Sequence, residues 1–126
     1  MSKIILNQKD FIFFQNKVKF WIKRLGLTDW QVYFEFEKLE ENDFAQIKWN
    51  YKGSKATMYL NQEWRNVPKF LNKEHQLEQT ALHEVLHLLL ARLNAWANDR
   101  KWDELEYEAE EHRVIHQIMQ VLLEKD

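Results

Sequence analysis

The stretch TALHEVLHLLL, residues 80–90, contains a His-Glu-x-x-His motif and decides how the rest of the chain is interpreted. Positions i and i+4 of an α-helix share a face, so the imidazoles of His83 and His87 can both point at one metal ion. Glu84 directly follows the first histidine, where it can reach a water molecule at the metal without binding the metal itself. We therefore predict that His83 and His87 are metal ligands and that Glu84 is catalytic.

The residues around the motif argue against an ordinary solvated helix carrying two histidines. A helix that is apolar on nearly every side is buried, and buried polar groups need partners. A metal ion would satisfy both histidines at once, and a water molecule or a substrate would satisfy Glu84. The apolar residues of this stretch are Leu82, Val85, Leu86, Leu88, Leu89, Leu90, Ala91 and Leu93.

Length and composition indicate one folded domain over residues 1–126, with 45% hydrophobic and 30% charged residues. The chain has no cysteine, so a metal must be held by histidine and carboxylate. A net charge of -2 argues against a nucleic-acid partner. No apolar run is long enough for a membrane span, and the N-terminal run is too short for a signal peptide. We expect a cytoplasmic protein.

Hydrophobic periodicity predicts an α+β fold, with helices on one face of a three-stranded antiparallel sheet. Asp10 is the expected cap of the first helix, and Gly26 suits its end. Strands are expected where apolar and polar residues alternate. In chain order we expect a helix over residues 10–25, strands over 30–36, 45–51 and 56–60, a connecting segment over 64–71, and helices over 73–96 and 102–123.

A catalytic zinc site usually has three protein ligands, and the third is sought in the last helix. The apolar stripe of that helix, extended backwards at helical spacing, passes through Glu111 and has Glu108 on its flank. A carboxylate in an apolar stripe needs an explanation, and metal ligation supplies one. We predict Glu111 as the third ligand and Glu108 as the reserve, ahead of His112 or His116. The stripe consists of Val114, Ile115, Ile118, Val121 and Leu122.

With Thr80, His83, Glu84 and His87 in a Thr-x-x-His-Glu-x-x-His arrangement after a sheet, the chain resembles minimal gluzincin-type zinc metallopeptidases. It is also similar to SprT-like and phage-encoded metallopeptidases. The resemblance implies a zincin-like fold, one Zn²⁺ ion, and hydrolysis of a peptide or protein substrate, with Glu84 as general base and proton shuttle. It further implies that substrate binds in extended form along a sheet edge, for which we expect the strand at residues 56–61. The short chain suits a phage origin.

Two departures qualify the resemblance. The metzincin pattern requires Gly and His where this chain has Leu90 and Leu93, so that subfamily is excluded. SprT-like proteins are expected to use a third histidine, whereas the best-placed residue in the periodic pattern is Glu111. The main alternative is a catalytically silent zinc-binding interaction module of the same fold. A metal-dependent nuclease or amidase and a structural zinc site are further alternatives.

Overall fold

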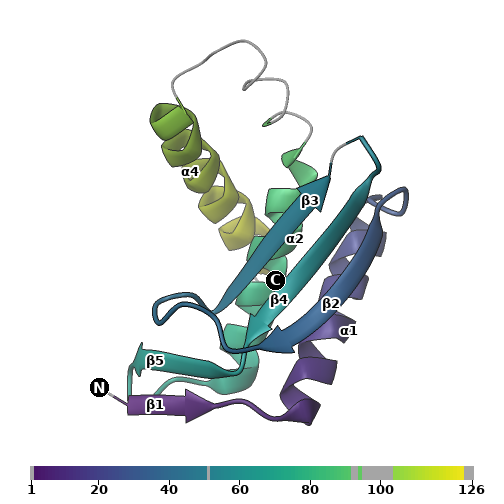
Figure 1. Ribbon diagram of the computed structural model, residues 1–126. Helices are drawn as coiled ribbons and strands as arrows, with labels where there is room; N and C mark the ends of the chain where they lie inside the picture. Colours follow the sequence, from purple (N-terminus) through teal and green to yellow (C-terminus); the bar gives the residue numbers. More distant parts are fainter. Residues whose placement is uncertain (1, 51, 92–93, 95–103, 124–126) are drawn as a thin grey trace.

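The computed structural model of this chain describes residues 2–50, 52–91, 94 and 104–123, which form a mixed α/β structure (Figure 1). The two sheets have the strand orders β1-β5 and β2-β4-β3. Among the described residues, no helix has both the length and the apolarity that crossing a membrane requires. In chain order the elements are β1 (Ser2–Ile5), α1 (Gln8–Arg24), β2 (Gln31–Glu37), β3 (Ala45–Asn50), β4 (Lys55–Asn61), β5 (Glu63–Val67), α2 (Lys73–Leu89) and α4 (Glu104–Leu123).

The three-stranded sheet has β4 in its centre, although β4 comes last of the three strands in sequence. β3 and β4 form the expected antiparallel hairpin, but β2 runs parallel to β4. The prediction of an entirely antiparallel sheet is therefore wrong, because it assumed that strands adjacent in sequence are also adjacent in the sheet. Residues 38–44 instead pass the end of β4 and carry the chain from β2 to β3 (Figure 1).

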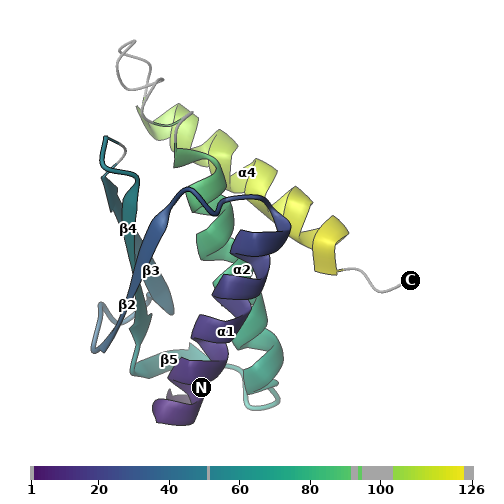
Figure 2. The same cartoon turned by 90° about the vertical axis from the view of Figure 1, so that its right-hand side faces the viewer.

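One face of this sheet is apolar and is covered by helices, as the alternation of residues predicts. Phe34 of β2 and Ile47 of β3 both lie opposite Met58 of β4, and Met58 is fully buried. Residues two positions apart on a strand share a face, so this pattern repeats along the sheet. α1 and α2 lie together on that face, and α4 lies beside α2 (Figure 2). The motif helix α2 is thus between the sheet and α4.

Asparagine side chains cap the N-terminal ends of α1 and α2. The Asn7 side chain accepts a hydrogen bond from the Asp10 main-chain N–H, and the Asp10 carboxylate accepts one from the Asn7 N–H. Asp10 is therefore the third helical residue of a capping box, not the cap that we predicted. Asn72 caps α2 through the His75 N–H. α2 ends at Leu89 with Leu90 as its C-cap, before the expected end at Trp96, and residues 92, 93, 95 and 96 lie outside the described residues.

A second sheet replaces much of the expected connecting segment at residues 64–71. β5 pairs antiparallel with β1, and neither strand is part of the sequence-based prediction. The Trp64 side chain of β5 is fully buried, stacks on Phe44 at 4.5 Å between ring centroids, and donates from Nε1 to the Phe44 carbonyl at 3.2 Å. β5 therefore supports the loop of residues 38–44 that leads into β3.

Candidate metal centre and catalytic cleft

Three histidines from two helices bring their ring nitrogens together. His83 and His87 are one turn apart on α2, and His112 comes from α4. Candidate donor atoms of all three rings lie within 4.8 Å of one another. The Nε2 atoms of His83 and His87 are 3.1 Å apart, so both rings point to the same place, as the i, i+4 spacing predicts. This cluster can hold a metal ion.

Hydrogen bonds at the opposite ring nitrogens orient two of these histidines. His87 Nδ1 lies 2.9 Å from Glu111 Oε1, and His112 Nδ1 lies 2.8 Å from the Glu108 carbonyl oxygen. A carbonyl oxygen and a carboxylate can only accept, so Nδ1 of each ring carries the proton. In the neutral form of each ring, Nε2 then has the lone pair that a metal ion requires. Metal-binding histidines usually show this arrangement, with a carboxylate or carbonyl behind the ring.

Glu111 reaches the site, as predicted, but its observed contact is with the back of the His87 ring. Glu111 as a residue is 6% exposed, and its second carboxylate oxygen, Oε2, is buried without a hydrogen-bond partner among the described residues. Glu111 as a metal ligand stays a prediction that the structure does not test. Glu108, the reserve, is exposed, and its main-chain carbonyl oxygen is the group that hydrogen-bonds to the histidine cluster.

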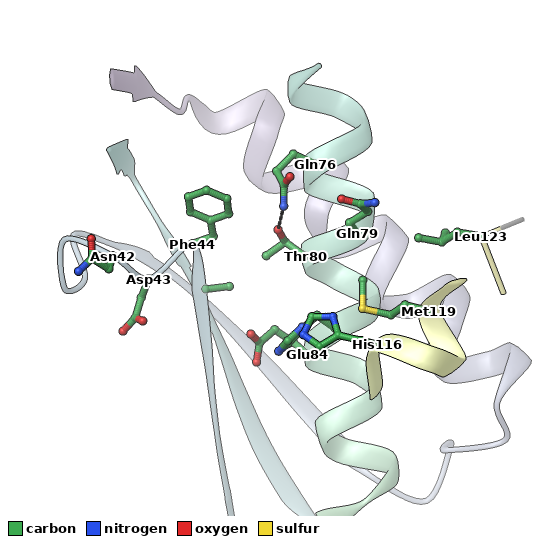
Figure 3. A pocket seen from close by; sticks show the side chains of 12 residues that line it. Asn42, Asp43, Phe44, Gln76, Gln79, Thr80, Glu84, His116, Met119 and Leu123 are labelled. Carbon is green, nitrogen blue, oxygen red and sulfur yellow. Dashed lines mark hydrogen bonds between the residues drawn. The ribbon is translucent and has the colours of Figure 1, made fainter. Parts of the chain in front are cut away.

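The Glu84 carboxylate lies beside the histidine cluster and borders a cleft. Its side chain points from α2 toward the start of β3 (Figure 3), and it is 7% exposed. The cleft has a volume of about 540 Å³. One wall is formed by residues 42–45, which lead into β3. The others are the face of α2 from Gln76 to Glu84 and the face of α4 from His116 to Leu123. A molecule in this cleft therefore meets Glu84 and His83 together.

Burial and neighbouring charges shift the pKa values of the motif residues in different directions. Burial lowers the pKa of His83 to about 4, so this ring is neutral at pH 7. Burial alone would also lower the pKa of His87, but the hydrogen bond to Glu111 and the charge of Glu84 outweigh burial and raise it. Burial raises the pKa of Glu84 to about 7, with His87 opposing the shift and Asp43 adding to it.

The cleft wall opposite α2 is held by a buried amide at the end of β4. Asn61 is 1% exposed, and its Nδ2 donates to the carbonyl oxygens of Glu40 at 3.1 Å and Asp43 at 2.6 Å. Its Oδ1 accepts from the main-chain N–H groups of Leu39 and Glu63 at 3.0 and 3.1 Å. All four hydrogen-bonding positions of the amide are satisfied. The loop of residues 38–44 beside Glu84 is therefore held in place by a side chain from the interior of the protein.

From the sequence, we ranked His112 below Glu111 as the third metal ligand. We assigned no functional role to Asn61 or Asp43. A signal for the α4 histidines was present, because His112 and His116 repeat the i, i+4 spacing of the motif. No comparable signal exists for Asn61, whose importance depends on the passage of residues 38–44 across the end of β4. Comparisons with protein-family models, with curated proteins and with solved structures give no match.

Proposed function

We propose that His83, His87 and His112 bind one Zn²⁺ ion, with Glu111 orienting His87. Two nitrogens of a tetrahedral zinc site, each about 2.0–2.1 Å from the metal, lie roughly 3.3 Å apart. The Nε2 atoms of His83 and His87 are already 3.1 Å apart, so little movement is needed. Three neutral imidazoles suit zinc among the common biological cations, and the absence of cysteine is no obstacle to such a site. An all-histidine set is favoured over the set with Glu111, because His112 belongs to the donor cluster whereas Glu111 is hydrogen-bonded to Nδ1 of His87.

We further propose that the chain is a zinc-dependent metallopeptidase with a zincin-like fold. The observation that carries this proposal is a buried carboxylate, Glu84, next to paired histidines at the wall of a cleft. Zinc held by three nitrogens supplies Lewis-acid chemistry, promoting ionisation of water and polarising a carbonyl group. Glu84 accepts a proton as the water oxygen attacks the peptide carbonyl carbon. It returns that proton to the amine nitrogen as the C–N bond breaks.

An extended substrate requires a free sheet edge beside Glu84. β4, the edge expected from sequence, is the central strand of its sheet and is paired on both sides. That expectation is therefore wrong, because it rested on the order of strands in sequence. β3 is an edge strand, and its first residue, Ala45, lines the cleft. We propose β3 as the strand along which a peptide backbone is aligned.

The experiment that tests this function is an assay of purified zinc-loaded protein against a mixture of peptides, with cleavage sites read by mass spectrometry. We expect cleavage that stops when zinc is removed by a chelator and returns when zinc is restored. Stoichiometric zinc without cleavage of any peptide or protein would instead favour the silent interaction module. Salt-sensitive binding of nucleic acid would favour the nuclease alternative.

Replacement of the third ligand separates the two candidate ligand sets. We expect His112→Ala to weaken zinc binding by about a thousandfold, because it removes one of three donor nitrogens. Glu111→Gln should weaken binding by about 10–100-fold at most, because an amide oxygen can still accept from His87 Nδ1. Affinity is measured by competition with a chromophoric chelator, and His75→Ala, on the exposed start of α2, is the control. Loss of zinc in Glu111→Gln but not in His112→Ala would restore Glu111 as the ligand.

A further inference from the structure

The cleft beside Glu84 has an uneven distribution of charge. Asp43 and Glu84 are its acidic residues, and no lysine or arginine is among the described residues that line it. Apart from these carboxylates and the histidines, the lining consists of neutral polar and apolar side chains, including Gln79, Thr80 and Met119 (Figure 3). A ligand side chain in this cleft is therefore surrounded by polar and apolar groups that do not compensate the two carboxylates.

Asp43 lies on a different wall of the cleft from the histidines. It belongs to the wall formed by residues 42–45, whereas His83, His87 and His112 lie on α2 and α4. Its carboxylate supplies negative charge on that wall, because the described residues place no ion-pair partner on it. Its only described side-chain contact is the neutral amide of Gln46, whose Nε2 donates to Oδ2 at 2.9 Å.

The position of Asp43 is fixed by the interior of the protein. Its carbonyl oxygen accepts a short hydrogen bond from the buried Asn61 amide, at 2.6 Å. The next residue, Phe44, is held through its carbonyl by Asn61 N–H at 3.0 Å and by Trp64 Nε1 at 3.2 Å. The main chain of Asp43 is anchored in this way on the cleft wall opposite α2, and the Gln46 amide donates to its carboxylate (Figure 3). A preorganised charge discriminates between ligands better than a mobile one.

We propose that the cleft binds a cationic group of the substrate, and that Asp43 is the residue that selects it. The chemical class is an alkylammonium or guanidinium group, either on a lysine or arginine side chain or at a free peptide N-terminus. Met119 and the other apolar residues of the wall accommodate the methylene groups of a long side chain, while the charged end meets Asp43. An acidic side chain is disfavoured at the same position. This inference rests on the proposed peptidase function for its substrate class.

Binding of matched peptides tests the proposal without relying on turnover. The protein is the zinc-loaded Glu84→Gln variant, labelled with ¹⁵N and titrated by nuclear magnetic resonance. The probes are acetylated and amidated pentapeptides of alanine with lysine, norleucine or glutamate in the centre, and the norleucine peptide with a free N-terminus. We expect shifts at residues 42–45 and 76–84, and a dissociation constant about tenfold lower for lysine than for glutamate. Tighter binding of the norleucine peptide with a free N-terminus than of its acetylated form would identify the terminal amine as the cationic group that the cleft binds.

Two further substitutions in the Glu84→Gln protein test whether Asp43 causes the preference for lysine over glutamate. Asp43→Asn should reduce the difference between lysine and glutamate to about twofold or less and leave norleucine binding unchanged. Glu40→Gln is the matched control, because Glu40 lies in the same loop and contributes only its carbonyl to the Asn61 contact. Equal binding of all peptides, no shifts with any peptide, or an unchanged preference in Asp43→Asn would each overturn the proposal. Selective binding without cleavage by the wild-type protein would instead contradict only the peptidase function.

Discussion

Glu84→Gln is expected to leave zinc binding within about threefold of wild type and to reduce peptide hydrolysis by about 10²–10⁴-fold. The amide has the shape of the carboxylate but cannot accept the proton of the attacking water. Because Glu84 contacts the cleft and makes no hydrogen bond with another described residue, no structural contact is lost. The measurement is kcat/KM on a cleaved peptide, together with metal content of the same sample.

The control for this substitution is Glu74→Gln, an exposed glutamate in the first turn of the same helix. It makes the same change of net charge away from the cleft, so hydrolysis should be unaffected. A Glu84→Gln variant that keeps zinc and retains full activity would remove Glu84 from the mechanism. Loss of zinc together with activity would show that Glu84 is needed for metal binding and would give no support to its role in proton transfer.

His83→Ala is expected to weaken zinc binding by at least about a thousandfold and to abolish hydrolysis. Zinc binding by protein sites contributes about 10–16 kcal/mol, so one of three ligands contributes roughly 4 kcal/mol, which corresponds to about a thousandfold in affinity. His87→Ala should behave in the same way. Affinity is measured by chelator competition, and far-ultraviolet circular dichroism shows whether the fold is retained.

His116→Ala is the matched control, because His116 lines the cleft near His83, with ring centroids 5.6 Å apart, but lies outside the donor cluster. Zinc affinity should change by less than about tenfold in this variant, whatever the effect on turnover. A loss of zinc as large as that in His83→Ala would mean that His116 completes a closed site of four ligands. Such a site would be structural, and the peptidase proposal would fail.

The local features of this fold could be predicted from the sequence. The alternation in β2, β3 and β4 and the periodicity of α1 and α2 record which side of each element is buried. The i, i+4 spacing alone predicts that His83 and His87 point to one place, and their Nε2 atoms are 3.1 Å apart. Information of this kind lies within one element and does not depend on how the elements are assembled.

The features that the sequence does not reveal depend on pairing between distant segments. β2 lies parallel to β4, and β1 pairs with β5 about sixty residues away in sequence. Neither pairing produces a periodic pattern that differs from that of a simple meander. The wall of the cleft follows from the same topology, since Asn61 reaches Asp43 only because residues 38–44 cross the end of β4.

The choice between Glu111 and His112 shows a further limit of periodicity. Adjacent residues on a helix point about 100° apart, so the stripe that packs on the core identifies only one of them. Glu111 is buried in that stripe, whereas His112 is exposed on the neighbouring face and still reaches the α2 histidines. A metal site at the border between two helices takes donors from the flank of a stripe as well as from its centre.

X-ray absorption at the zinc edge of the wild-type protein, loaded with one equivalent of zinc at pH 7.5, tests whether three histidines bind the metal. We expect a first shell of nitrogen and oxygen at about 2.0–2.1 Å, with outer-shell scattering from three imidazoles and one position open to solvent. Failure to bind zinc stoichiometrically, or a shell with four imidazoles, would contradict the proposed site.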